Sequence, residues 1–205
     1  MTGQGARAAK TTANRAKMLA AARTLFAERG YTATTMKAIA EAAGMAVQTL
    51  YFTFATKRAI LSELLDTEIA GDTEPVATMD RPWFDAALAA APADQIRLQV
   101  DAAATIFGRV SPLLEVIRSA AATDPELAEL WQTNLTQRRA VQLRLATALT
   151  EKTALRNGLP AERAADISLA VLAPETYHLL VHERGWTTAD WTAWAADALI
   201  RQLLP

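Results

Sequence analysis

Apolar residues recur along most of this chain at intervals of three and four positions, the spacing of one face of an α-helix. No convincing run alternates apolar and polar residues with the period of two that marks a half-buried strand. The pattern therefore predicts an all-α protein. Outside residues 34–61, helices are expected over residues 14–29, 94–108, 125–152, 160–184 and 188–204, and another is expected to begin at Ser111 and Pro112.

The segment from residue 34 to residue 61 predicts two short helices joined by a tight turn. Thr35 is suited to cap the first helix, because its hydroxyl can accept a hydrogen bond from a free amide of the first turn. Gly44 can adopt the left-handed conformation that ends a helix. In the second helix, over residues 46–52, the flanking pattern turns Leu50 and Phe54 inward and leaves Val47, Gln48, Thr49, Tyr51 and Thr53 on or near the outer face.

A helix-turn-helix of this size fits the major groove of DNA, with the N-terminal residues of its second helix meeting base edges. Residues 1–60 carry nine Lys or Arg against two Asp or Glu, whereas residues 61–205 carry twelve against twenty. A basic N-terminal part on a chain of net charge −1 favours a polyanion as the partner of that part alone. A helical hairpin inside a larger bundle, with a solvated basic face, is the alternative.

The same segment closely resembles the TetR family of one-component transcriptional regulators. Members typically show a run of the form GVSxGTLYxHFxSKxxL, and the matching positions here hold Gly44, Thr49, Leu50, Tyr51, Phe54, Lys57 and Ile60. Residues 25–44 also resemble the first two helices of that family. The resemblance covers residues 15–61, and the rest of the chain is similar in its helical layout and length alone.

The resemblance implies DNA-binding roles for seven residues, despite three departures. Ala46 stands where a capping serine is usual, Gln48 where glycine is common, and Thr53 where histidine or tyrosine is common. Because glutamine can bond adenine N6 and N7 together, Gln48 is compatible with base reading. By position, Lys37 would reach a phosphate or a base edge, Val47 and Gln48 would face bases, Thr49, Tyr51 and Thr53 would meet phosphates or base methyl groups, and Lys57 would bind phosphate at a helix start.

The implied organisation is an N-terminal three-helix helix-turn-helix head followed by a larger C-terminal helical domain for ligand binding and dimerisation. We place a disordered basic arm at residues 1–13, the DNA-binding head at 14–56 and the ligand-binding and dimerisation domain at 57–205. Basic residues at and beyond this arm can contact phosphates or enter a minor groove; they are Arg7, Lys10, Arg15 and Lys17. A flexible tail without such a role is the alternative.

TetR-like regulators usually enclose a small-molecule pocket among their middle helices, which the resemblance implies here too. Apolar residues dominate the candidate lining, so we expect a largely hydrophobic effector with few polar anchors. Plain core packing is the alternative for each candidate. The candidates are Trp83, Phe107, Trp131, Tyr177 and His178.

By the same resemblance, the last two helices pair with their copies in a second chain as a four-helix bundle. The resulting homodimer would place two recognition helices on a pseudo-palindromic operator of double-stranded DNA. The alternative is a core role within one chain. Interface candidates with helical spacing are Trp191, Trp194, Ala198 and Leu199.

Other chemistry finds little support in the sequence. Without cysteine the chain has no disulfide or thiolate site, and His178 with His182, four residues apart, is a weak metal pair. We predict no metal, no cofactor and no enzymatic activity, since neither a phosphate-binding glycine loop nor a serine–histidine–acid set can be placed. No apolar run is long enough for a bilayer and no signal core begins the chain, so a cytoplasmic protein is expected.

The sequence therefore predicts a sequence-specific regulator of transcription that responds to a ligand. We expect a repressor that a small hydrophobic effector releases from its operator. Three alternatives stay open: an activator of the same family, an all-helical ligand-binding or catalytic module, and a protein that coats DNA without sequence preference.

Overall fold

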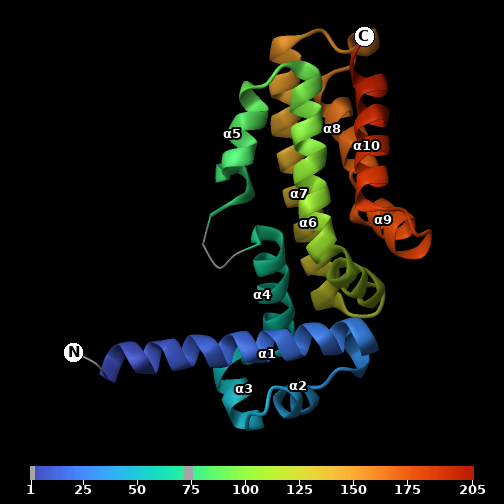
Figure 1. The fold of residues 1–205 in the computed structure, drawn as a ribbon. Coiled ribbons are helices and arrows are strands. Elements are labelled where there is room, and N and C mark those ends of the chain that lie inside the picture. The colour runs from blue at the N-terminus through green and yellow to red at the C-terminus, as the bar shows by residue number, and fades with distance from the viewer. Residues whose placement is uncertain (1–2, 72–75) are drawn as a thin grey trace. The chain divides into compact units, whose positions relative to one another are not determined.

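The computed structural model describes the backbone of residues 3–71 and 76–205, and over these ranges it contains helices and no strand (Figure 1). The predicted all-α class is confirmed. The helices, with η for 3-10 segments and for one π-helix, are α1 (Gly3–Ala33), α2 (Met36–Ala42), α3 (Val47–Phe54), α4 (Lys57–Ala70), η1 (Thr78–Asp80), α5 (Pro82–Ala89), α6 (Pro92–Ala121), α7 (Pro125–Lys152), η2 (Arg156–Gly158), α8 (Ala161–Val171), α9 (Pro174–Tyr177), η3 (His178–Glu183, the π-helix) and α10 (Thr188–Leu203).

The chain divides into two compact units. Unit 1 comprises Met1–Thr67 and Val116–Leu130, and unit 2 comprises Glu68–Glu115 and Trp131–Pro205. Helices α4, α6 and α7 each contribute residues to both units. Unit 1 therefore holds the helix-turn-helix together with most of α4, rather than ending at residue 56.

Unit 1 is built on the apolar face of α1. Its buried residues fall at helical spacing, and each large side chain that leaves water contributes about 1.5–3 kcal/mol. Helix α2 contacts both α1 and α3. The side chains that meet in this interior are Met18, Leu25 and Phe26 of α1, Ile39 of α2, Leu50 and Phe54 of α3, and Ile60, Leu61 and Leu64 of α4.

Helix α1 corrects the prediction of a disordered arm for the described part of residues 1–13. The helix begins at Gly3, in a stretch that holds four alanines, the residue of highest helix propensity, and no proline. This helix was predicted to end at residue 29, but Gly30 forms a kink with φ 73° and ψ 175°, after which helical turns continue to Ala33.

In unit 2, proline did not act as a helix boundary at Pro112. A new helix was predicted to begin there, yet α6 runs through it without a break from Pro92 to Ala121. Buried Val110, Leu113 and Leu114 hold both sides of the proline in one helix. The carbonyl of Gly108, which loses its bond to an amide at Pro112, belongs to an exposed residue that water can reach.

The C-terminal part of unit 2 is more segmented than the predicted helices at 160–184 and 188–204. Helix α8 ends at Val171, and Pro174 begins the short α9, which passes into the π-helix η3. Helix α5, packed by Phe84 and Ala87 against Leu145 of α7, was not predicted. The bounds of α7, Pro125–Lys152, agree with the prediction.

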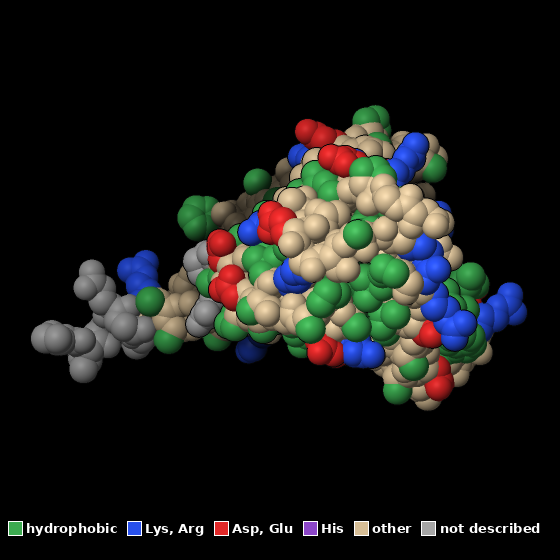
Figure 2. All heavy atoms as spheres, turned by 90° about the horizontal axis from the view of Figure 1, so that it is seen from above, with side chains coloured by type: hydrophobic (Ala, Val, Ile, Leu, Met, Phe, Trp, Pro, Cys, Tyr) green, Lys and Arg blue, Asp and Glu red, His purple; other side chains and the backbone are tan. Residues whose placement is uncertain are grey.

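Charges are mixed on the face seen in Figure 2, where acidic and basic side chains are interspersed with apolar and uncharged ones. No helix in the part of the chain that the structure describes is long and apolar enough to cross a membrane.

Candidate DNA interface and ligand cavity

The turn between α2 and α3 has the features predicted from the sequence. Thr35 accepts a hydrogen bond at Oγ1 from the amide of Ala38, at 3.1 Å, and so caps α2. Gly44 adopts φ +66°, a conformation in which a Cβ would be strained. Ala46 provides no side-chain cap for α3. The recognition helix therefore depends on packing for its orientation.

Helix α3 exposes the face that was predicted to read DNA. Gln48, Thr49 and Tyr51 are exposed, whereas Val47 and Thr53 are half-buried. The Thr53 hydroxyl donates to the Thr49 carbonyl at 2.8 Å, so a phosphate contact by Thr53 would have to compete with this bond. On α2, Lys37 is 79% exposed and its Nζ lies 3.8 Å from a carboxylate oxygen of Glu41.

Phe52 was not among the predicted contacts, yet it is the most exposed large apolar residue of α3, at 92%. A phenyl ring this exposed gains little from packing within one chain. It can meet the methyl group of a thymine in the major groove. The run of outward residues after Gln48 could have signalled it, because Phe52 follows Gln48 by one helical turn.

The connection from α3 to α4 is a strained γ-turn at Ala55. Its φ of 58° and ψ of −50° are rare for a residue with a Cβ, and the amide of Thr56 donates to the carbonyl of Phe54 at 2.6 Å across it. The Thr56 hydroxyl then caps α4 by accepting from the amide of Ala59 at 3.0 Å.

Lys57, the first residue of α4, is bound inside unit 1. Its Nζ donates to the carbonyl oxygens of Tyr31 and Thr34 at 2.7 and 2.8 Å and lies 3.9 Å from the centre of the Tyr31 ring. Burial lowers the pKa of Lys57, and the Asp124 carboxylate opposes that shift. A phosphate contact by Lys57 stays a prediction, since two of the three N–H donors of its ammonium are already used.

Arg15, predicted as part of the basic region at the N-terminus, is also engaged within unit 1. Its guanidinium forms two hydrogen bonds to the Glu63 carboxylate of α4, and its Cζ lies 4.4 Å from the centre of the Phe54 ring. The side-chain hydrogen bond to Glu63 raises the pKa of Arg15. This pair ties α1 to α4 beside the end of the recognition helix, so Arg15 is not free for DNA.

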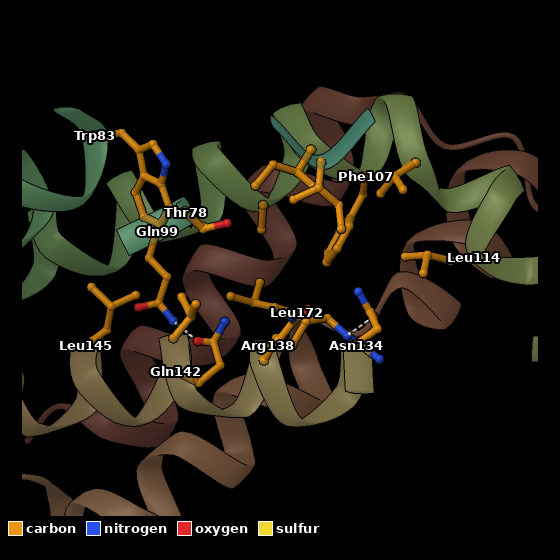
Figure 3. A pocket seen from close by; sticks show the side chains of 16 residues that line it. Thr78, Trp83, Gln99, Phe107, Leu114, Asn134, Arg138, Gln142, Leu145 and Leu172 are labelled. Atoms are coloured by element: carbon orange, nitrogen blue, oxygen red, sulfur yellow. Dashed lines mark hydrogen bonds between the residues drawn. The ribbon is translucent and has the colours of Figure 1, made fainter. Parts of the chain in front are cut away.

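Unit 2 contains a cavity of about 110 Å³ between α5, α6 and α7 (Figure 3). Trp83 of α5 and Phe107 of α6, both predicted, form part of its wall. Leu172, just after the end of α8, closes another part. The other lining residues are Ile69, Thr78, Gln99, Ala103, Ile106, Val110, Leu114, Asn134, Gln137, Arg138, Val141, Gln142 and Leu145.

The α7 side of this cavity is polar, which was not predicted. Asn134, Arg138 and Gln142 follow one another at intervals of four residues and so share one helix face. Gln99 Nε2 donates a short hydrogen bond to Gln142 Oε1, and Arg138 Nε donates to Asn134 Oδ1 at 3.0 Å. A row of this spacing is also typical of a solvated helix face, so the sequence alone gave no signal that it is buried.

The fold matches that of solved regulators over more than nine-tenths of the chain. One similar structure is a protein from Syntrophomonas wolfei described as a TetR-family transcriptional regulator, with 17% sequence identity, a TM-score of 0.73, and coverage of 92% of this chain and 94% of that one. Another is a protein from Saccharomonospora viridis described as a transcriptional regulator and bound to choline, with 16% identity, a TM-score of 0.70, and coverage of 95% of this chain and 99% of that one. A third is SmeT bound to triclosan, with 18% identity, a TM-score of 0.68, and coverage of 94% of this chain and 92% of that one. No match was found among curated proteins.

Residues 18–64 match the family model for bacterial regulatory proteins of the tetR family. Residues 18–64 therefore form a domain of this family. The matched residues run from Met18, which is buried on α1, to Leu64 of α4. The family model thus covers the helix-turn-helix and the helices beside it, while the solved structures share the fold of nearly the whole chain.

Three predicted pocket residues do not line the cavity. Tyr177 is buried behind Phe107, with ring centres 5.9 Å apart, and its hydroxyl lies 2.9 Å from Thr188 Oγ1. The Trp131 ring lies 5.4 Å from the Arg138 guanidinium. His178 lies on η3, beside His182. Aromatic residues near a cavity fill the core around it as readily as they line it.

The predicted dimer residues fall on different sides of α10. Trp191 and Leu199 are fully buried within one chain, and the Trp191 ring packs 5.0 Å from that of Tyr177, so both belong to the core instead. Trp194 is exposed and contacts Trp186, with ring centres 6.3 Å apart, while Ala198 is half-buried. Helical spacing could not tell these two apolar faces apart.

His178 and His182 form no metal centre with their neighbours in the described structure. No group of three or more His, Cys, Asp or Glu residues there could hold a metal ion. His182 Nε2 instead lies 3.0 Å from Ser111 Oγ. Burial, and then the nearby His178, lower the pKa of His182.

Proposed function

We propose that this chain is a TetR-family regulator that binds operator DNA as a homodimer and is released from it by a small molecule that enters the unit 2 cavity. The observation that carries the proposal is the exposed outer face of α3 within a domain that matches the family model. This face offers an amide at Gln48, a hydroxyl at Thr49 and the aromatic rings of Tyr51 and Phe52.

Within this proposal, different exposed residues contact the bases and the phosphates of the DNA. Gln48, in the first turn of α3, reads a base edge, for which adenine offers the matching donor and acceptor. Thr49 and Tyr51 contact phosphates, and Val47 supports this contact from a half-buried position. Phe52 contacts a thymine methyl group. Lys37, exposed on α2, contributes a phosphate contact that carries no sequence information.

Dimerisation is assigned to the exposed aromatic residues of unit 2. Trp186 and Trp194 stack edge to face at the surface, and Leu179 of η3 is also exposed. Exposed aromatic residues are enriched in the cores of protein interfaces. A second copy packed on this surface would give two recognition helices and a two-fold operator.

Coupling between the cavity and α4 is assigned to Arg109 of α6. Its Nε donates to the Glu68 carbonyl at 2.9 Å and its Nη2 to the Ile69 carbonyl at 3.2 Å, at the C-terminal end of α4. The neighbouring residues Phe107 and Val110 line the cavity, as does Ile69 itself. A ligand that moves this wall moves the end of the helix that begins directly after α3. A coupling of about 1–3 kcal/mol would suffice for a useful response.

Ligand binding by relatives supports this role for the cavity. The Saccharomonospora viridis protein is bound to choline, and SmeT is bound to triclosan. Release of DNA by the ligand, as in a repressor, is part of the proposal. The same contacts would serve an activator.

The proposal is tested by selecting duplexes that bind the full chain from a random pool and sequencing them. We expect an inverted repeat with two equivalent half-sites. Gln48→Ala should relax the preference at one position of each half-site, since a bidentate contact to the right base contributes about 1–3 kcal/mol of discrimination. A pool without any enriched sequence would contradict the proposal.

A further inference from the structure

The chemistry of the cavity wall narrows the class of ligand that the proposed function requires. Of the sixteen described residues that line the cavity, Arg138 is the one that carries a formal charge. Gln99, Asn134 and Gln142 are buried, although residues of these types are mostly exposed in proteins. All three turn toward the cavity in Figure 3, so buried polarity is concentrated around this space.

The opposite wall is apolar. It is formed by Trp83 of α5 and by Ile106, Phe107, Val110 and Leu114 of α6. Figure 3 shows Trp83 and Phe107 facing the side on which Gln142, Arg138 and Asn134 lie. A ligand that uses both walls must itself have an apolar side and a polar group, which rules out a pure hydrocarbon.

Arg138 is held in place by one hydrogen bond, but another of its nitrogens has no hydrogen-bond acceptor. Its Nε bonds Asn134, while its Nη2 is buried and has no hydrogen-bond partner in the protein. A guanidinium has five N–H donors and keeps its charge at any physiological pH. A buried charged donor without an acceptor is costly, and a ligand acceptor would remove that cost.

The Glu175 carboxylate acts on the charge of Arg138. Its charge opposes the lowering of the Arg138 pKa that burial causes. Its Oε2 is nevertheless buried without a hydrogen-bond partner, and Glu175 is not part of the cavity lining. The carboxylate therefore moderates the positive charge of Arg138 without occupying its free donors.

We infer that the cavity selects a small anion with an apolar body, whose carboxylate or equivalent acceptor group meets the Arg138 guanidinium. The inference rests on the proposed function, since it names the ligand class of the same cavity. The amides of Gln99 and Gln142 fix the orientation of the polar group, because their mutual bond uses only part of their donors and acceptors. The volume of about 110 Å³ suits a short chain or a single small ring.

A cation is disfavoured by the same geometry. A quaternary ammonium of the kind bound to the Saccharomonospora viridis protein would meet Arg138 as a like charge. The two proteins share 16% identity, so a common fold does not require a common ligand class.

Three probes of equal chain length and different charge test the inference: hexanoate, hexanamide and hexylammonium. Their affinities for the full-length protein are measured by isothermal titration calorimetry at neutral pH, without DNA. We expect hexanoate to bind about tenfold more tightly than hexanamide, the gain of one charge-assisted hydrogen bond, and hexylammonium to bind most weakly. Equal affinities, a preference for the ammonium, or no binding of hexanoate would overturn the inference.

Two variants separate ligand binding by Arg138 from a purely structural pairing with Glu175. Arg138→Met keeps the apolar stem and should abolish the preference for hexanoate over hexanamide while leaving the affinity for hexanamide unchanged. Glu175→Gln should keep or strengthen hexanoate binding, because a competing negative charge is removed. An undiminished preference in Arg138→Met would overturn the inference, as would loss of hexanoate binding in a folded Glu175→Gln protein.

The proposed function is tested by a different result, because it requires sequence-specific binding to DNA. If the wild-type protein binds its operator but shows no preference for hexanoate over hexanamide and hexylammonium, the inferred ligand class is rejected and the regulatory role is kept. Anion binding by a protein that shows no sequence preference on DNA would reject the regulatory role and keep the cavity chemistry.

Discussion

At the residue scale, the unexpected finding is that two basic side chains of the N-terminal part serve the fold. Lys57 and Arg15 both belong to the positive charge that suggested a polyanion partner. The structure places Lys57 on two carbonyl groups and Arg15 on Glu63. Net charge correctly indicated the N-terminal part of the chain as basic, but it could not show which Lys and Arg side chains are free to bind phosphate.

Lys57→Met should therefore destabilise unit 1 by about 2 kcal/mol, because two charge-assisted hydrogen bonds are lost. Urea denaturation followed by circular dichroism measures this change. Lys37→Ala is the matched control, since Lys37 is exposed and its one ion pair is with the neighbouring turn. It should leave stability within about 0.5 kcal/mol and reduce the salt slope of DNA binding by roughly one unit. Unchanged stability in Lys57→Met would contradict the structural role.

His182 gives unit 2 a dependence on pH with a definite sign. Its folded pKa is lowered, so the neutral form is favoured in the fold, next to His178, Ser111 and the Tyr177 ring. The corresponding stability is present above the unfolded pKa of 6.5 and is lost as the pH falls below that value. His182→Gln should melt with a smaller drop between neutral and mildly acidic pH than the wild type. An equal drop would show that other groups cause it.

At the element scale, the sequence predicted a helix correctly where local signals and packing agree. Helix α7 begins after Asp124, whose Oδ1 accepts from the amides of Glu126 and Leu127, and that capping pattern was visible from the sequence. At Pro112 the local signal was outweighed by buried neighbours on both sides. The polar row of α7, Asn134, Arg138 and Gln142, was not predicted to line a cavity. Spacing shows which residues share a helix face, but it does not show whether that face packs against protein or contacts solvent.

Arg109 fastens the end of α4 in unit 2 through the carbonyls of Glu68 and Ile69, and Gly71 leaves room for its guanidinium. Gly71 has φ +79°, and a Cβ there would lie 2.8 Å from Arg109 Nη2. Gly158 has a similar φ of +67° with no atom near its Cβ position, so it is the control for backbone strain. Gly158→Ala should cost about 1–2 kcal/mol of stability, and Gly71→Ala should cost about 1–2 kcal/mol more as the Arg109 bonds are disturbed.

A double-mutant cycle in urea denaturation checks this reading. In an Arg109→Ala background, Gly71→Ala should cost no more than Gly158→Ala does. An excess cost that persists without Arg109 would mean that some other contact opposes the added methyl group.

At the scale of the whole molecule, the family of the N-terminal domain and the overall fold were predictable, because they depend on the motif around α3 and on the number and length of the helices. The dimer surface was less predictable. Periodicity placed apolar residues on two sides of α10, and only the structure assigns Trp191 to the core and leaves Trp194 outside. The effector class depends on how residues from α5, α6 and α7 combine, which no single segment reveals.

Trp194→Arg should convert the proposed dimer to a monomer, because a charge would replace an exposed ring at the interface. Sedimentation velocity measures the mass, and circular dichroism checks that the helices persist. Thr192→Arg, on the same helix, is a control for added charge. A wild-type protein that sediments as a monomer, or a Trp194→Arg dimer as tight as the wild type, would contradict this surface assignment.

The most direct test of the regulatory role is the affinity of the full-length protein for DNA from upstream of its own gene, against a scrambled duplex of equal length and composition. Fluorescence anisotropy at about 150 mM salt keeps the nonspecific electrostatic contribution near its physiological level. A sequence-specific regulator that controls its own gene should prefer the upstream DNA by about a thousandfold or more. Equal affinity for the two duplexes, or no binding to either at low salt, would contradict it.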